Sequence, residues 1–249
     1  MKLLADIGNS TIQVALWKKQ SLYKILQIPA NDYKKINSLL LKYKKYKIDS
    51  AFFSCVANDE IARIFKKYVK QLFECPIRRI KSSRKYFQIK NAYDSYKKFG
   101  DDRWCLIVGS YLKYKRPLLL VDCGTLTTID IVNKSGRHLG GYILAGFDCY
   151  KNSFDKINNL KNLKFNKKQK KKHVYFPKNT HDGIFHGYRL MICSTIQKIF
   201  NDFRTQYNVQ PKLVICGGNS KEILNLIKIK HEHELHMVLQ AVGLISDKI

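Results

Sequence analysis

Two acidic residues close apolar, strand-forming runs of the chain, and each is followed by a glycine and by small hydroxyl side chains. Asp6 and Gly8 form the first such pair, and Asp122 and Gly124 form the second. A carboxylate at the end of a buried strand is costly unless it is paired or binds a ligand. Carboxylate oxygens suit Mg²⁺, and glycine lets the backbone approach a phosphate closely. The repeat therefore predicts a phosphate site, although Asp-x-Gly also occurs in ordinary hairpin turns.

A third acidic group lies between these two in the sequence. Gly100 is followed by Asp101, Asp102 and Arg103 and then by an apolar run, which is typical of a helix start. Two interpretations stay open. In one, an aspartate caps the helix and pairs locally with Arg103. In the other, Asp102 accepts a proton from a substrate hydroxyl while Arg103 holds an anionic group.

The elements that must position these groups follow the same order in each half of the chain. In the first half we expect Asn58 to cap a helix. The first half is predicted to hold strands at 2–7, 11–17, 22–28, 48–56 and 77–80, helices at 31–46 and 59–72, and a loop at 83–99. The second half is predicted to hold strands at 118–122, 127–132, 140–147 and 213–216, helices at 148–163, 181–206, 220–227 and 235–248, and a lysine-rich loop at 164–173.

Each half opens with a meander of three strands rather than with a βαβ unit. This order fits an α/β protein with the duplicated actin-like ATPase (ribonuclease H-like) fold. We expect two β-β-β-α-β-α halves, at 1–115 and 116–249, with a cleft between them. The Gly217-Gly218 turn is then either a cradle for a nucleotide or a simple connection from strand to helix.

Composition limits the class of protein. The chain has 249 residues, 45% of them hydrophobic, and a net charge of +27. The charge is mostly lysine and is spread along the chain, so we interpret it as solvated surface and expect no specific nucleic-acid partner. No apolar run approaches the roughly 20 residues that span a bilayer. We therefore expect a soluble, cytoplasmic protein with no membrane partner.

Cysteines and clustered histidines often carry chemistry, but here we expect neither group to have a catalytic or metal-binding role. The seven cysteines stand mostly in apolar contexts and are expected to be buried free thiols. The segment 231–236, His-Glu-His-Glu-Leu-His, alternates as a surface strand does and departs from the H-E-x-x-H pattern of zinc enzymes. We expect no metal there.

Four motifs, in this order and spacing, resemble those of the type III pantothenate kinase family. They are Asp-Ile-Gly-Asn-Ser at 6–10, Gly-Asp-Asp-Arg at 100–103, Asp-Cys-Gly-Thr-Leu-Thr-Thr-Ile-Asp at 122–130, and Gly-Gly-Tyr-Ile-Leu-Ala-Gly at 140–146. Asn179-Thr180 and Gly217-Gly218 are weaker matches. The resemblance covers essentially the whole chain.

The resemblance implies a dimeric kinase with the actin-like fold. It would phosphorylate pantothenate with ATP, the first committed step to coenzyme A. The resemblance also implies Mg²⁺, a monovalent cation (K⁺ or NH₄⁺), and a pantothenate pocket built at the dimer interface.

The same resemblance implies a role for individual residues. Asp102 is the implied general base for the pantothenate hydroxyl. Asp122 is the implied ligand of the monovalent cation, and Asp6 is expected to hold Mg²⁺ through phosphate or water. The implied ATP contacts are Asp6, Ile7, Gly8, Asn9, Ser10, Thr11, Ile12, Gln13 and Thr125. The implied pantothenate contacts are Tyr93, Gly100, Asp101, Asp102, Arg103 and Thr180.

Four positions depart from the family pattern without deleting a catalytic group. Ser10 replaces Thr, Ala145 replaces Pro, and Cys216 replaces Thr. Asp101 replaces a small residue, so its like charge is expected to raise the pKa of Asp102. Two alternatives stay open: a non-catalytic relative that acts as a transcription accessory factor, and another actin-like small-molecule kinase.

Overall fold

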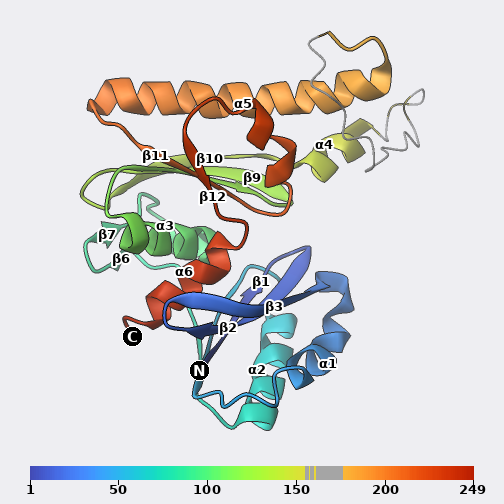
Figure 1. Ribbon diagram of the computed structural model, residues 1–249, viewed down its shortest axis with the longest axis vertical. Coiled ribbons are helices and arrows are strands. Elements are labelled where there is room, and N and C mark those ends of the chain that lie inside the picture. Colours follow the sequence, from blue (N-terminus) through green and yellow to red (C-terminus); the bar gives the residue numbers. More distant parts are fainter. Residues whose placement is uncertain (155–156, 158–159, 161–175) are drawn as a thin grey trace. The chain divides into compact units, whose positions relative to one another are not determined.

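The chain opens with the predicted meander of three antiparallel strands (Figure 1). The computed structural model describes residues 1–154, 157, 160 and 176–249. A five-stranded sheet in the order β3-β2-β1-β4-β5 is built from β1 (Lys2–Ile7), β2 (Thr11–Lys18), β3 (Ser21–Pro29), β4 (Ser50–Cys55) and β5 (Ile77–Arg79). The parallel pairing of β1 with β4 sets Asp6 opposite Ser54. The first candidate carboxylate therefore ends a central strand.

Two helical segments accompany this sheet, and one of them departs from expectation. The predicted helix at 31–46 is wrong in extent, because only α1 (Ile36–Leu41) is α-helical, after the 3-10 segment η1 (Ala30–Lys35). The backbone leaves helical values at Asp32 (φ −89°, ψ 21°), whose carboxylate accepts a hydrogen bond from the Lys35 ammonium at 2.8 Å. The other helix, α2 (Asp59–Phe73), is confirmed.

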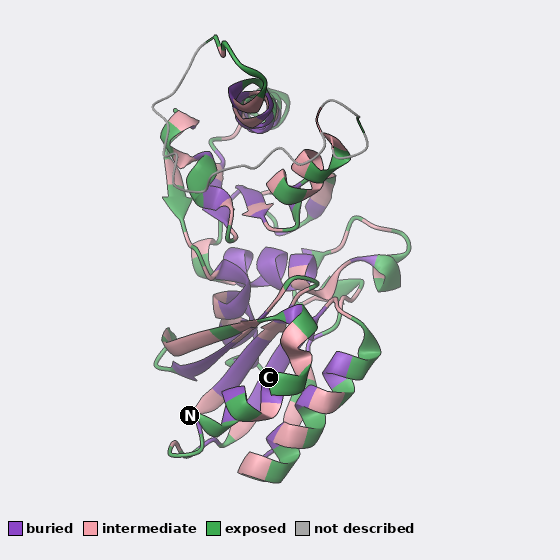
Figure 2. Cartoon of the chain, turned by 90° about the vertical axis from the view of Figure 1, so that its right-hand side faces the viewer, coloured by how far each residue is buried: buried purple, intermediate pink, exposed green. Residues whose placement is uncertain are grey.

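The start of α2 is fixed by the cap that the sequence predicts. The Asn58 side chain accepts a hydrogen bond from the Ile61 backbone N–H at 3.0 Å. Asp59 and Glu60 then occupy the first turn, where the helix dipole favours negative charge. The amphipathic pattern buries Phe65, whose ring packs 5.3 Å from that of Phe53 on β4. Figure 2 shows the central strands β1, β2 and β4 of this sheet as largely buried and the outer face of the helix as exposed.

The loop predicted at 83–99 contains a small hairpin, and a long helix follows it. The elements are β6 (Lys85–Tyr86), β7 (Ile89–Lys90), the 3-10 turn η2 (Tyr96–Lys98) and α3 (Asp101–Tyr114). Helix α3 packs against the last helix, α6 (Met237–Ser246). The contact is close, because a Cβ on Gly109 would overlap the backbone and side chain of Ala241. The expected helix at 235–248 is therefore confirmed, and it lies beside α3.

The second sheet repeats the connectivity of the first. Its order is β10-β9-β8-β11-β12, which has the same pattern as β3-β2-β1-β4-β5. The strands are β8 (Leu118–Cys123), β9 (Leu126–Val132), β10 (His138–Ala145), β11 (Lys212–Cys216) and β12 (His231–His233). The repeated topology confirms the expected duplication within a mixed α/β fold.

The helices of the second half agree with the sequence only in part. The long helix α5 (Thr180–Tyr207), orange in Figure 1, is confirmed. The expected helix at 148–163 is present as α4 (Phe147–Ser153), and its remainder and the lysine-rich loop at 164–173 lie mostly or wholly outside the described residues. The helix expected at 220–227 is wrong: two 3-10 turns, η5 (Ser220–Glu222) and η6 (Leu224–Leu226), stand there. The N–H groups of Ile223 and Leu226 bond to carbonyls three residues back, at Ser220 and Ile223, which is the pattern of 3-10 turns.

Contacts divide the chain into two compact units, and each is described by itself below. Unit 1 comprises Met1–Leu118, Asp130–Gly140 and His236–Ile249, and unit 2 comprises Leu119–Ile129 and Gly141–Leu235. The predicted halves, 1–115 and 116–249, concern the duplication rather than compactness, so that boundary stays a prediction. Among the described residues, no helix has the length and apolar character needed to cross a membrane.

Candidate functional site

The turn after β1 holds the first candidate carboxylate in a defined position. The Ser54 hydroxyl donates a hydrogen bond of 2.6 Å to Oδ1 of Asp6. The Gly8 N–H donates to the Thr11 carbonyl at 3.0 Å, which closes the turn. Asn9 and Ser10, at its tip, are exposed. The structure therefore anchors the carboxylate and presents polar side chains of the predicted ATP segment to solvent.

Gln13 extends this segment along β2, opposite Asp6 in the strand register. Its Oε1 lies 3.1 Å from Nδ1 of His236, just before α6. With an amide oxygen as partner, Nδ1 is the donor in this contact. Burial lowers the pKa of His236. A neutral imidazole thus orients the Gln13 side chain.

Asp102 lies in the first turn of α3, where a glycine leaves room for its carboxylate. Gly100 is the N-cap residue, and a Cβ there would lie 2.5 Å from Oδ1 of Asp102. That oxygen accepts a hydrogen bond of 2.7 Å from the Arg103 N–H. Burial raises the pKa of Asp102 above the ordinary 3.8, and the like charge of Asp101 raises it further as a smaller cause. Burial therefore makes this carboxylate a stronger base than an exposed aspartate.

Asp101 is already engaged in an ion pair with another element. Its carboxylate accepts hydrogen bonds from Nε of Arg79 at 2.9 Å and from the Ser82 N–H at 2.8 Å. Arg79 also donates to the Cys55 carbonyl at the end of β4. The local pairing of an aspartate with Arg103 that we considered is therefore wrong for Asp101. This network ties the start of α3 to the first sheet.

Arg103 is almost fully buried and pairs with Asp130 on β9. Its Nη2 and Nε donate to the two carboxylate oxygens of Asp130 at 2.6 and 3.0 Å. The guanidinium also lies over the ring of Phe99 at 4.5 Å and the ring of Tyr93 at 5.7 Å. Nη1 is 3.5 Å from the Tyr93 hydroxyl. Two of the predicted pantothenate contacts, Tyr93 and Arg103, are thus brought together.

Sequence reasoning missed the two residues behind Arg103. Asp130 and His138 are both inaccessible to solvent, and Nε2 of His138 lies 3.0 Å from Oδ1 of Asp130. A signal was present, because Asp130 interrupts a strand whose neighbours Ile129 and Val132 are wholly buried. A carboxylate in such a run needs a partner. The local pattern does not reveal this partner, because Arg103 lies on α3 and the strand β8 separates α3 from Asp130 in the sequence.

Asp122 ends β8 in unit 2, where it faces a second glycine turn. Gly217 has a left-handed backbone (φ 88°), and a Cβ there would overlap Oδ1 of Asp122 and lie 2.6 Å from the Cys123 carbonyl oxygen. Asn219 holds the facing turn by donating from its N–H to Cys123 at 2.9 Å and from its side chain to Gly124 at 3.2 Å. Glycine at 217 thus lets this turn approach Asp122 and Cys123 more closely than any side chain would allow.

The remaining predicted contacts are in the same unit as Asp122. Thr125 is exposed in the hairpin turn after β8. Thr180 is the exposed first residue of α5, and the Asn179 side chain caps that helix by accepting from the Asp182 N–H at 2.9 Å. Asp6 and Asp102 lie in unit 1. The site in which Asp6 and Asp102 are expected to act together with Asp122, Thr125 and Thr180 stays a prediction.

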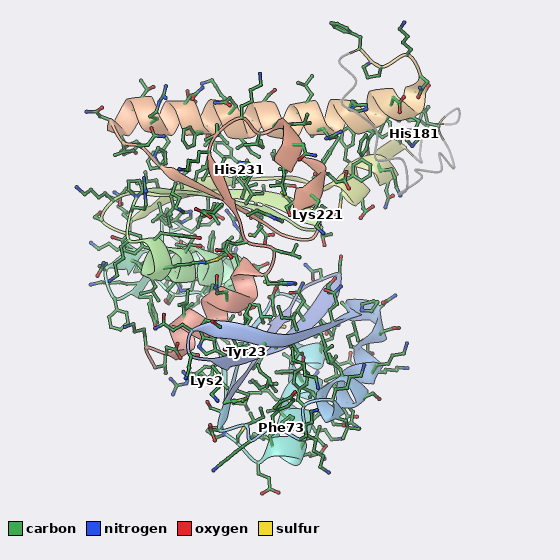
Figure 3. The ribbon with its side chains drawn as sticks, viewed as in Figure 1. Lys2, Tyr23, Phe73, His181, Lys221 and His231 are labelled. Atoms are coloured by element: carbon green, nitrogen blue, oxygen red, sulfur yellow. The ribbon has the colours of Figure 1, made fainter. Side chains whose placement is uncertain are left out.

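The histidine-rich segment does not assemble a metal site in the part of the chain that is described. His231 lies on β12, and His181 lies in the first turn of α5 (Figure 3). No group of three or more histidine, cysteine or acidic side chains suited to a metal occurs among the described residues. All seven cysteines are free, and five of them are buried. Buried free thiols are thus confirmed for five of the seven cysteines, whereas the expectation of no metal at 231–236 stays a prediction.

Comparison with known proteins gives the chain its relatives. A profile described as "Type III pantothenate kinase" matches residues 2–202. The protein named type III pantothenate kinase in Sulfurihydrogenibium sp. (strain YO3AOP1) is 25% identical, with 97% of this chain and 98% of that protein covered. The protein of the same name in Pseudoalteromonas translucida is 31% identical, over 59% of this chain and 57% of its own length.

Solved structures agree on the fold. A protein titled a putative Baf family transcriptional activator from Campylobacter jejuni matches with a TM-score of 0.62 at 21% identity, over 99% of this chain and 98% of that one. Component A of the (R)-2-hydroxyglutaryl-CoA dehydratase from Acidaminococcus fermentans matches with a TM-score of 0.57 at 9% identity, over 98% and 96%. These likenesses confirm the actin-like ATPase fold. With a profile match over most of its length, the chain belongs to the type III pantothenate kinase family, and it is a kinase.

Proposed function

We propose that this kinase transfers the γ-phosphoryl group of ATP to the primary hydroxyl of pantothenate. The product is 4′-phosphopantothenate, which opens the cytoplasmic route to coenzyme A. The observation that supports this most is Asp102, whose carboxyl group has a raised pKa in the first turn of α3 and is followed directly by Arg103, held by Asp130. Family membership supplies the substrates.

Asp102 is the proposed general base. Phosphoryl transfer depends mainly on positioning and on charge neutralisation. The Asp102 carboxylate would orient the attacking hydroxyl and take its proton as the bond to phosphorus forms. Its raised pKa makes it a stronger base than an ordinary aspartate.

The proposed substrate contacts fall into two groups, one for the carboxylate of pantothenate and one for the phosphates of ATP. Arg103 and Tyr93, which lie together, would hold the pantothenate carboxylate, together with Gly100, Asp101 and Thr180. Residues 6–13 and Thr125 would contact ATP, because the exposed tip of the first turn carries amide and hydroxyl donors. The carboxylate of Asp101 already accepts two hydrogen bonds, so its contribution would come from the backbone or from positioning.

The residues present fit the two cations that the family implies. Asp6 supplies a fixed carboxylate oxygen, the ligand type of Mg²⁺, beside the phosphate turn. Asp122 supplies a carboxylate oxygen, and the Cys123 carbonyl oxygen lies beside the same Gly217 turn, so the oxygen ligands that K⁺ or NH₄⁺ would need are present there. When bound, both cations would neutralise charge on the triphosphate.

A homodimer with pantothenate bound at its interface forms part of the proposal. Unit 2 exposes large apolar side chains, among them Leu190, which is 68% exposed on α5, and Tyr142 and Ile143 on β10. Exposed apolar side chains in such numbers are common at protein interfaces. Light scattering on the purified protein tests the oligomeric state.

The experiment that tests the function is a substrate panel. ATP consumption would be measured with pantothenate, with sugars and with no acceptor, each with and without K⁺. We expect turnover only with pantothenate. Turnover with a sugar would favour another actin-like kinase. No turnover, together with DNA binding that weakens steeply with salt, would favour the transcription accessory factor.

A further inference from the structure

Asp130 is a buried carboxylate that the proposed reaction does not use directly. Its side chain is inaccessible to solvent, yet it accepts three hydrogen bonds, two from Arg103 and one from His138. Removing a carboxylate from water is costly unless it is both charge-paired and hydrogen-bonded. The structure meets both conditions, and it does so at the one arginine proposed to contact substrate.

His138 is held in a single tautomer by its two neighbours. Its Nδ1 lies 3.4 Å from the backbone N–H of Ala92, which is a donor, so Nδ1 accepts. Nε2 then carries the proton and donates to Asp130 at 3.0 Å. The neutral ring therefore links a carboxylate on β9 to the segment that precedes Tyr93.

That segment is also packed onto the histidine. The rings of Tyr93 and His138 are nearly parallel, at 4° with centroids 6.0 Å apart, and Phe99 packs 5.4 Å from His138. The Ala92 contact and the ring contact together fix the backbone and the side chain at Tyr93. His138 therefore directly positions Tyr93, one of the predicted pantothenate contacts.

Asp130 positions Arg103, another of the predicted pantothenate contacts. It occupies the Nε and Nη2 edge of Arg103, and Nη1 lies next to the Tyr93 hydroxyl. A free arginine side chain samples many rotamers, and a planar, bidentate pair holds it in one orientation. The donors that remain for an anionic ligand are thereby directed to the side where Tyr93 lies.

We propose that Asp130 and His138 are positioning residues that set how this enzyme recognises the carboxylate of its substrate. Asp130 fixes the guanidinium of Arg103, and His138 fixes both Asp130 and the Tyr93 segment. The inference rests on the proposed function. It adds two residues that touch neither substrate nor the reacting atoms and that determine affinity through their neighbours.

The test compares pantothenate with pantothenol, which has a hydroxyl in place of the carboxylate. Dissociation constants for both are measured by titration calorimetry on the full chain. Asp130→Asn keeps the shape of the side chain and removes its charge. We expect the affinity for pantothenate to fall roughly ten- to a hundredfold, the range for a lost charged hydrogen bond, while the affinity for pantothenol changes by less than about threefold.

A matched pair at position 138 separates the two hydrogen bonds of the imidazole. His138→Gln places a donor where Nε2 faces Asp130, and His138→Asn places an acceptor where Nδ1 faces Ala92. We expect the preference for pantothenate over pantothenol to survive better in the glutamine variant, since the Asp130 contact orients Arg103. Asp247→Asn is the control, because Asp247 is a carboxylate of the same unit that contacts Lys2 and Trp17.

Each outcome decides something. An unchanged preference in a folded Asp130→Asn or His138→Asn variant, or an equal loss for both ligands, overturns the inference and leaves a purely structural role. If Asp130→Asn does not fold, the two position-138 variants decide in the same way. A wild-type protein that binds no pantothenate contradicts the proposed function instead, so the two failures are distinguishable.

Discussion

At the scale of single residues, burial and hydrogen-bond partners give two neighbouring carboxyl groups different properties. Asp102 and Asp130 are close in space to the same arginine, but they have different roles. Asp130 is paired with the guanidinium side chain, whereas Asp102 accepts only the backbone N–H of Arg103. The positive charge of Arg103 is already compensated by Asp130. The Asp102 side chain therefore stays available to take a proton.

The raised pKa of Asp102 makes the pH profile a direct test. A base must be deprotonated, so kcat/KM for pantothenate should fall as pH falls through this pKa. Because burial raises the pKa, the acid limb should lie above the ordinary aspartate value of 3.8. The profile of kcat/KM against pH checks this. Activity that stays flat down to the ordinary range would remove Asp102 from the role of base.

Sequence reasoning reached some of these residues and not others, for a physical reason. Asp6, Asp102 and Asp122 were identified because each follows or precedes an apolar run with glycine beside it, which is a local pattern. Asp130 and His138 were not, because their importance arises from contacts across elements. Asp101 illustrates the same limit, since its partner Arg79 lies on a different strand.

At the scale of elements, the close contact of α3 with α6 fixes the helix that carries Asp102. Cap chemistry predicted the start of α2, because an N-cap acts within one turn. Helix α1 was overestimated, since apolar periodicity over 31–46 correctly marks Ile36, Leu39 and Tyr43 as buried but does not require an α-helix throughout.

Two glycines within helices should respond oppositely to alanine. Gly109→Ala should destabilise the protein by about 1–3 kcal/mol, because the added methyl group overlaps Ala241. Gly183→Ala, on α5, meets none of the described residues within 4 Å and should be neutral or stabilising by up to about 1 kcal/mol. Urea unfolding of both variants measures this. Equal effects at the two positions would contradict the tight packing of α3 on α6.

At the scale of the whole molecule, one topology is used twice and its two strand-end carboxylates have diverged. Asp6 and Asp122 end corresponding strands, β1 and β8, of sheets with the same order. The first is hydrogen-bonded to Ser54 beside the phosphate turn. The second faces a glycine in the left-handed region. Duplication thus supplies two equivalent positions, and their neighbours distinguish the proposed roles.

The proposed division of roles predicts how K⁺ acts. Asp122→Ala should abolish stimulation of turnover by K⁺ while the protein stays folded, because the carboxylate supplies the charged ligand at that site. Turnover is measured over a range of K⁺ concentrations, with circular dichroism as the check on folding. Thr195→Ala, on α5, is a control distant in sequence from all predicted site residues. K⁺ dependence that survives in folded Asp122→Ala would return Asp122 to a structural role.

Steady-state turnover of Asp102→Asn with pantothenate and ATP tests most directly whether Asp102 is the general base. The substitution keeps the shape of the side chain and removes its capacity to take a proton. We predict that kcat falls by roughly 10²–10⁴-fold, the range for loss of a general base, with the KM for ATP little changed. A folded variant that turns over pantothenate at a near-normal rate would contradict the account.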